Sequence, residues 1–224
     1  MLYFDIAISG LVMLFCALTV AADVRGKNMG RLLFKVIASM LFLFIGFILV
    51  ASEGTARAAA LFAALLACVF GDVFLAYYDA DRTVSHNFIY GISAFSAAQI
   101  FFSVYTVISF GTLLPWSIIA AVLLTALGTG AIFVFKIKPG RLLAICSAYM
   151  LLLSWAFCAA VFALIKAPCL STALLAAGSL LFVISDTILL FKYFKASSGV
   201  LTAFNLITYY LGVVLIALSP AAAL

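Results

Sequence analysis

Residues 57–78 read RAAALFAALLACVFGDVFLAYY, and stretches of this kind decide the fold of the chain. Between Arg57 and Tyr78 the run is apolar except for one carboxylic acid, Asp72. A helix needs about 20 apolar residues to cross a bilayer, so this stretch predicts a membrane-spanning helix. Similar runs recur along the chain, and we predict eight spans, at residues 2–21, 32–51, 57–78, 87–108, 114–135, 141–165, 170–191 and 200–219.

The composition of the chain indicates the same class of protein. Of the 224 residues, 69% are hydrophobic and 8% are charged, whereas a soluble domain has about 25% charged residues. So few charges cannot cover a water-facing surface, which excludes a soluble domain, a disordered chain and a nucleic-acid-binding module. Because the apolar runs are continuous rather than alternating, helices are expected and not a membrane β-barrel. We therefore predict an all-α polytopic membrane protein with a single domain over residues 1–224.

The basic residues are concentrated in every second connection between spans. One set of connections and adjoining span ends holds nine of the twelve lysines and arginines, and the other set holds two, Arg57 and Lys166. Basic loops tend to stay in the cytoplasm, so both termini are predicted to lie outside it. The first apolar run lacks the basic segment that opens a signal peptide, and we expect it to remain as a helix. In a bacterium the expected location is the cytoplasmic membrane.

The two halves of the chain resemble each other. Gly30-Arg31-Leu32-Leu33 returns 110 residues later as Gly140-Arg141-Leu142-Leu143, and Asp72 has a counterpart 114 residues later in Asp186. Two parallel four-helix repeats would be related by an axis along the membrane normal, which would place the two aspartates at one depth, facing each other. Chance similarity between apolar helices is the alternative. The predicted repeats cover roughly residues 1–110 and 111–224.

The two intramembrane aspartates are the candidate catalytic groups. An acidic residue inside a span is costly and usually faces a cavity or a partner. Asp72 lies six residues before Tyr78 and Asp186 six before Lys192, so each carboxyl is expected roughly 9 Å from the cytoplasmic end of its span. Two carboxyls in an apolar cavity should not both ionise, so one could serve as a general acid and the other as a base. The alternative is that each merely joins two helices.

Other polar residues are candidates for lining the same cavity. Gln99, Asn205 and Tyr209 stand at helical spacing in the fourth and eighth spans, where hydrogen bonding between helices is the alternative role. Lys35, one turn inside the second span, either extends to the lipid headgroups or binds a phosphate.

Polar residues outside the spans are expected to have ordinary roles. Asp79 and Asp81 are interpreted as solvated residues of a cytoplasmic turn. His86 is the only histidine and the five cysteines are scattered, so no metal site is predicted.

At these positions the chain resembles the YhhN family of integral-membrane lysoplasmalogenases. The resemblance covers nearly the whole chain and rests on the order and spacing of short motifs. These are Lys35, Gly71-Asp72 followed by Val73-Phe74-Leu75-Ala76, Gly91, Phe95, Leu181-Phe182-Val183-Ile184-Ser185-Asp186 and Thr208-Tyr209-Tyr210-Leu211. Val36, Gln99 and Val213 stand where the family usually has Pro, His and Gln.

The resemblance implies hydrolysis of the vinyl ether bond of lysoplasmalogens, which releases a fatty aldehyde and a glycerophospho-alcohol. It makes Asp72 and Asp186 the expected acid–base pair, in the cytoplasmic half of the membrane, and it requires no metal or organic cofactor. The residues expected to bind the lysophospholipid are Lys35, Arg31, Arg141, Gln99, Asn205, Tyr209 and Tyr149.

Three other functions are compatible with intramembrane aspartates. A proton-coupled transporter of a small molecule or a lipid also uses repeated halves and a polar cavity. An intramembrane aspartyl protease uses two membrane aspartates, but Val69 occupies the first glycine position of its GxGD motif. A lipid-binding membrane protein without catalytic activity is the third.

Overall fold

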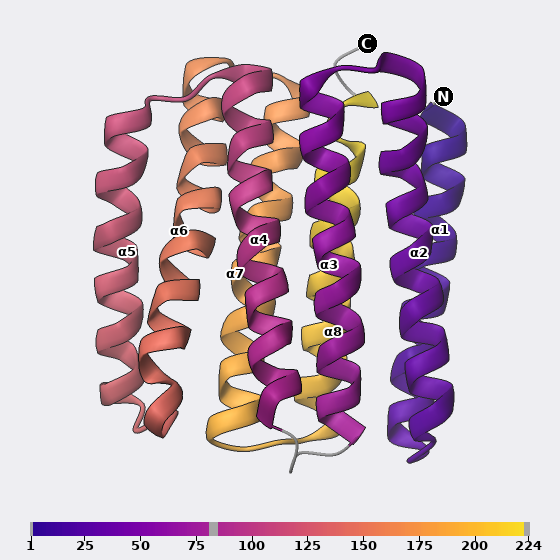
Figure 1. Cartoon of the computed structure of the whole chain (residues 1–224), viewed down its shortest axis with the longest axis vertical. Coiled ribbons are helices and arrows are strands. Elements are labelled where there is room, and N and C mark those ends of the chain that lie inside the picture. Colours follow the sequence, from indigo (N-terminus) through magenta and orange to yellow (C-terminus); the bar gives the residue numbers. More distant parts are fainter. Residues whose placement is uncertain (1, 81–84, 222–224) are drawn as a thin grey trace.

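The computed structural model describes residues 2–80 and 85–221, and within these ranges the chain forms eight long α-helices (Figure 1). All eight are long and apolar enough to cross a membrane, which confirms the predicted spans. Asp81, interpreted from the sequence as a solvated residue of a cytoplasmic turn, lies outside the described residues. The helices are α1 (Leu2–Val24), α2 (Asn28–Glu53), α3 (Ala56–Ala80), α4 (Ser85–Phe110), α5 (Leu114–Val134), α6 (Leu143–Lys166), α7 (Leu170–Phe194) and α8 (Gly199–Leu218), with a short 3₁₀-helix, η1 (Gly140–Leu142), before α6.

The helices run up and down in one bundle, with the start of α1 and the end of α8 at the same end (Figure 1). At the opposite end, the connections between α1 and α2, α5 and α6, and α7 and α8 carry exposed lysines and arginines. We call this the basic end. Among the described residues, its exposed cations are Arg25, Lys27, Lys136, Lys138, Arg141 and Lys195.

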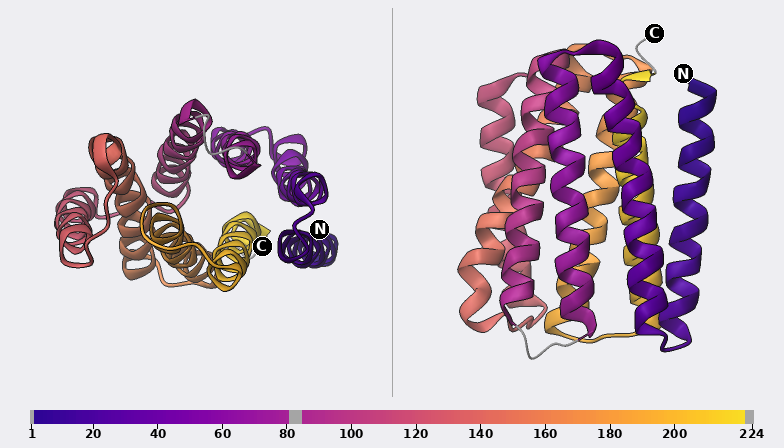
Figure 2. Two further views of the ribbon diagram at one scale, coloured as in Figure 1. Left: turned by 90° about the horizontal axis from the view of Figure 1, so that it is seen from below. Right: turned by 45° about the vertical axis from the view of Figure 1, so that its right-hand side comes forward.

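A ring is formed by α2, α3, α4, α6, α7 and α8, with α1 beside the place where α8 and α2 meet, as the end-on view of Figure 2 shows. Around it, α2 packs on α3, α3 on α4, α4 on α6, α6 on α7 and α7 on α8, and a smaller contact between α8 and α2 closes the ring. The two remaining helices lie outside it in unequal positions. Helix α1 packs on both α2 and α8, whereas α5 packs on α6 and has at most slight contact with α4.

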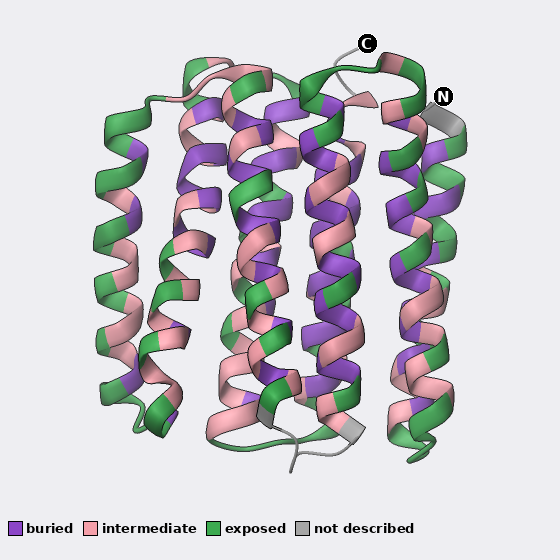
Figure 3. Cartoon of the chain, in the orientation of Figure 1, coloured by how far each residue is buried: buried purple, intermediate pink, exposed green. Residues whose placement is uncertain are grey.

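Burial follows this arrangement (Figure 3). The ring helices turn their buried residues inward, while α5 exposes large apolar side chains along most of its length, among them Ile119, Leu123 and Leu127. Exposed apolar side chains are what a helix facing lipid tails presents. Within each predicted half the same consecutive helices are neighbours, although the unequal places of α1 and α5 break the correspondence. The pseudo-repeat stays a prediction.

Small residues allow the consecutive helices of the ring to approach closely. On α7 and α8, Gly178 and Gly212 face each other so tightly that a Cβ on either would lie within 3 Å of the other's carbonyl oxygen. On α3 and α4, Gly71 lies under the ring of Phe95, and Gly91 lies against Leu75. Such small-residue contacts are typical of helix packing in membranes, where close backbone approach replaces the hydrophobic effect.

We expect Gly178→Ala and Gly212→Ala to destabilise the bundle, because the added methyl groups would lie 2.6 Å and 2.8 Å from a backbone oxygen. Overpacking of this kind typically costs about 1–3 kcal/mol, which thermal unfolding of the purified protein in detergent would detect. Gly10→Ala is the matched control, since nothing lies within 4 Å of a Cβ at that position of α1. Unfolding temperatures equal to wild type in all three variants would contradict the close contact of α7 and α8.

Candidate active site

Asp72 is the most completely enclosed carboxyl group of the site, with 1% of the residue exposed. It lies on α3, eight residues before the last residue of that helix, Ala80. Ser39 of α2 and Tyr209 of α8 donate hydrogen bonds to its Oδ2 at 2.6 Å and 2.7 Å. The ammonium of Lys35 lies 3.2 Å from its Oδ1. Groups from two other helices, α2 and α8, therefore hold this carboxylate of α3.

Lys35 is held inside the bundle rather than extended to the membrane surface. Its residue is 8% exposed, and its Nζ is paired with Asp72. The backbone around it is also fixed, because the Tyr210 hydroxyl donates to the Lys35 carbonyl oxygen at 3.1 Å. Lys35 and Ser39 are one helical turn apart, so both reach the same carboxylate from one face of α2.

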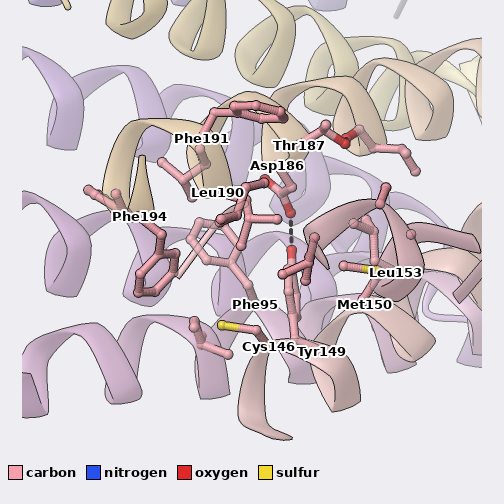
Figure 4. A pocket seen from close by; sticks show the side chains of 18 of the residues that line it. Phe95, Cys146, Tyr149, Met150, Leu153, Asp186, Thr187, Leu190, Phe191 and Phe194 are labelled. Carbon is pink, nitrogen blue, oxygen red and sulfur yellow. Dashed lines mark hydrogen bonds between the residues drawn. The ribbon is translucent and has the colours of Figure 1, made fainter. Parts of the chain in front are cut away.

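Asp186 has a different environment. It lies on α7, eight residues before Phe194 at the end of that helix, and it is only partly buried. The hydroxyl of Tyr149 on α6 donates a hydrogen bond to its Oδ2 (Figure 4). Gln99 of α4 lies near the Tyr149 hydroxyl, and its buried Nε2 has no hydrogen-bond partner among residues 2–80 and 85–221. Among the described residues, no cation is paired with Asp186.

The two aspartates are held in related ways. At the offset of 110 that aligns the starts of α2 and α6, Ser39 corresponds to Tyr149, and each donates its hydroxyl to the aspartate of the following helix. At the offset of 114, Tyr209 corresponds to Phe95, which has no hydroxyl to donate. In the predicted repeat, Ser39 and Tyr149 are therefore equivalent hydroxyl donors, one to each aspartate. Asp72 has a second hydroxyl donor, Tyr209, that has no equivalent at Asp186.

The backbone next to Asp186 is fixed by α8. The side-chain amide of Asn205 donates to both the carbonyl oxygen and the hydroxyl of Ser185 at 2.9 Å. Ser185 in turn donates to the Asn205 carbonyl oxygen at 3.2 Å. Asn205 thus orients the residue that precedes the aspartate.

An apolar cavity of about 220 Å³ lies between α4, α5, α6 and α7, with Asp186 and Tyr149 on its wall (Figure 4). The cavity lies where α5 packs on α6 without packing closely on α4. In the other predicted half, α1 occupies the equivalent place and packs on both α2 and α8. The rest of the cavity lining is largely aliphatic and aromatic, and includes Phe95, Leu124, Met150, Leu153, Leu190 and Phe194. Cavities of this composition accept hydrocarbon rather than water.

A second, narrower pocket of about 30 Å³ contains both aspartates. Asp72 and Asp186 line it together. The two pockets share Asp186 and a wall made of Leu75, Phe95, Leu189 and Tyr193. Asp186 is therefore the carboxyl that borders both the apolar cavity and the polar pocket.

The structure brings most of the predicted site residues together. The narrow pocket is lined by Arg31, Lys35, Asn205 and Tyr209 besides the two aspartates, and Tyr149 lines the apolar cavity. Gln99 is buried and lines neither pocket. Arg141 is exposed in η1 at the basic end and lines neither pocket.

Two further charged residues of this pocket, Asp79 and Lys192, did not emerge from the sequence as site residues. The interpretation of Asp79 as a solvated turn residue is wrong, because its side chain is 11% exposed and is paired with Lys192 of α7 at 3.2 Å. A signal was present, since Asp79 follows Asp72 by seven residues and Lys192 follows Ser185 by seven. Seven residues are close to two turns of helix, so Asp79 lies on the same face of α3 as Asp72, and Lys192 lies on the same face of α7 as Ser185.

The comparisons with known proteins agree with the resemblance drawn from the motifs. No curated protein and no solved structure matched the chain. The pattern of the YhhN family matches residues 30–220, which include both aspartates and every other residue that lines the two pockets except Thr19. Because this match covers much more than half of the chain, the chain belongs to the YhhN family.

Proposed function

We propose that this protein is a membrane hydrolase that cleaves the vinyl ether bond of lysoplasmalogens through Asp186 and Asp72. The observation that carries the proposal is the position of Asp186, which borders an apolar cavity on one side and a charged pocket containing Asp72 on the other. A lysoplasmalogen has the same division. Its hydrocarbon chain and its charged headgroup meet at the vinyl ether.

The reaction consumes one water molecule and needs an acid and a base. A proton is added to the vinyl carbon that is not bonded to oxygen, which leaves an oxocarbenium ion. Water adds to the cationic carbon while a base removes its proton. The resulting hemiacetal breaks its bond to the glycerol oxygen, giving a fatty aldehyde and a glycerophospho-alcohol. General acid–base assistance of this kind typically contributes ~10²–10⁴-fold to the rate.

The contacts of the two aspartates favour different roles. Asp72 accepts two hydroxyl hydrogen bonds and faces an ammonium group, an arrangement that suits a carboxylate anion. Asp186 faces hydrocarbon and accepts one hydrogen bond from a neutral donor, which suits a protonated carboxylic acid. We therefore assign proton donation to Asp186, and stabilisation of the cation and deprotonation of water to Asp72.

The apolar cavity is proposed to hold the alkenyl chain. Its lining supplies contacts for methylene groups, and burying each methylene contributes about 0.8 kcal/mol. A chain in this cavity would present its first two carbons to Asp186. The basic end is predicted to be cytoplasmic, which would put the site in the cytoplasmic half of the membrane.

A proton-coupled transporter is the alternative that the same residues allow. Transporter sites are typically formed by interrupted helices near the middle of the membrane, whereas all eight helices run unbroken through the described ranges. Uptake of a substrate into proteoliposomes without release of an aldehyde would favour the transporter.

We expect Asp186→Asn and Asp72→Asn each to lower the rate of aldehyde release from a lysoplasmalogen by ~10²-fold or more, because each amide removes an acid or a base without changing shape. The assay uses purified protein in detergent, with size-exclusion chromatography to verify folding. Asp5→Asn is the matched control, since Asp5 is a buried aspartate in the first turn of α1 and lines neither pocket. A wild-type rate in either site variant would show that the paired-carboxyl mechanism is wrong.

The proposed position of the substrate's alkenyl chain is tested with Gly128 of α5, which lines the apolar cavity next to Met150. Gly128→Leu should fill part of the cavity by displacing the flexible Met150 side chain. We expect kcat/KM to fall roughly tenfold or more for a hexadecenyl substrate, because each methylene that loses its place costs about 0.8 kcal/mol, and to change little for an octenyl substrate.

Gly130→Leu is the control for this experiment. Gly130 lies two residues further along α5, is exposed, and has nothing within 4 Å of a Cβ. Equal effects of Gly128→Leu on both chain lengths would place the chain elsewhere.

A further inference from the structure

The most unusual group outside the aspartate pair is an enclosed ion pair between Lys192 of α7 and Asp79 of α3. Their Nζ and Oδ2 atoms are 3.2 Å apart, and the two side chains are 5% and 11% exposed. Arg31 of α2 lies 3.9 Å from the same Oδ2 and is itself paired with Asp23 at 2.9 Å. Two cations thus surround one carboxylate in the narrow pocket.

This pair is incompletely satisfied. Asp79 Oδ1 is buried and has no hydrogen-bond donor among the described residues. Enclosed ion pairs gain little net stability, because desolvation offsets most of the attraction, and an unpaired carboxylate oxygen adds a further cost. The arrangement is poor as a structural element, and it leaves a place for a group that donates to Asp79.

We propose that Lys192 and Asp79 form the headgroup site for a zwitterionic glycerophospholipid, with the phosphate bound by Lys192 and Arg31 and the ammonium bound by Asp79. Lys35 is paired with Asp72 and is not assigned to the headgroup site. The site rests on the proposed function for the identity of the lipid, a lysophospholipid whose chain occupies the apolar cavity.

Distances along the helices match such a ligand. Lys192 is six residues from Asp186 on α7, and Asp79 is seven residues from Asp72 on α3, which corresponds to about 9 Å and 10.5 Å of helix. In a lysoplasmalogen, six bonds of about 1.5 Å separate the phosphorus from the vinyl ether carbon, roughly 8 Å when extended. A phosphate at Lys192 therefore leaves the vinyl ether at the level of the aspartates.

The charges match as well. When the headgroup enters, the phosphate replaces Asp79 as the partner of Lys192, and the ammonium replaces Lys192 as the partner of Asp79. The net charge of the pocket is unchanged, so neither charge is left unpaired in an enclosed place. A headgroup with only a negative charge would leave Asp79 unpaired and is expected to bind more weakly.

The proposal is tested with saturated alkyl ether lipids, which lack the vinyl group and stay intact whether or not the protein is a hydrolase. Three ligands share one chain: an alkylglycerol without charge, an alkyl glycerophosphoethanolamine, and an alkyl glycerophosphate. Binding to the purified full-length protein in detergent is measured by native mass spectrometry. Aldehyde release from a lysoplasmalogen, measured separately on wild type, tests the proposed function alone.

We expect Lys192→Gln to weaken binding of both phosphate-containing ligands roughly 10- to 100-fold, the usual effect of losing a charged hydrogen-bond partner. Binding of the alkylglycerol should not change, and Lys192→Arg should retain affinity for the phosphates. Asp79→Asn should shift preference from the ethanolamine lipid toward the alkyl glycerophosphate. Lys195→Gln, which removes an exposed lysine three residues away, is the control for loss of a nearby positive charge.

Because Lys192→Gln leaves Asp79 with only the longer contact to Arg31, at 3.9 Å, the double variant Asp79→Asn with Lys192→Gln guards against misfolding by removing both charges together. It should lose the advantage of both phosphate-containing ligands over the alkylglycerol. Unchanged binding of the ethanolamine lipid in the single or the double variant would overturn the proposal. An equal loss for all three ligands would overturn it too.

Discussion

The cost of enclosing a carboxylate among apolar helices governs this structure. Asp72 is compensated by an ammonium group and two hydroxyl donors that come from α2 and α8, helices far apart in the sequence. An uncompensated charge at that place would cost several kcal/mol. The Asp72 carboxylate, which raises the free energy of burying α3, therefore also fixes how α2, α3 and α8 face one another.

The unequal positions of α1 and α5 give the two aspartates their different surroundings. Helix α1 covers the seam between α2 and α8, and Asp72 lies enclosed in that half of the ring. Helix α5 packs on α6 and has at most a slight contact with α4, and the apolar cavity lies in this gap beside Asp186. The two aspartates, which the predicted repeat makes equivalent, thus have different surroundings, Asp72 among polar partners and Asp186 against hydrocarbon. This difference underlies the proposed acid and base roles, and the charged pair at Lys192 extends the polar side toward the basic end.

Much of the site was visible in the sequence because each signal was local. Asp72 and Asp186 stand out as single acids within apolar runs, and Lys35 stands one turn inside a span. The spacing of Asp79 and Lys192 hinted that they share faces with Asp72 and Ser185, but the pairing of Lys35 with Asp72 and of Asp79 with Lys192 was not visible. Both depend on which face of one helix meets which face of another, and residues 113 positions apart leave no local trace of their contact. Arg141, which the predicted repeat matches to Arg31, lies exposed in η1, whereas Arg31 lines the narrow pocket.

The sequence by itself determined that eight helices cross a membrane, approximately where each begins and ends, and that two of them carry an acid in their interior. It could do so because every span must satisfy its own backbone hydrogen bonds in lipid, a condition that each run of about 20 residues meets alone. Only the tertiary structure decided that Asp186 borders a cavity and that Asp72 is paired with Lys35. Those outcomes depend on the rotation and displacement of whole helices, which are set by contacts between glycines, aromatic rings and charges that no single run contains.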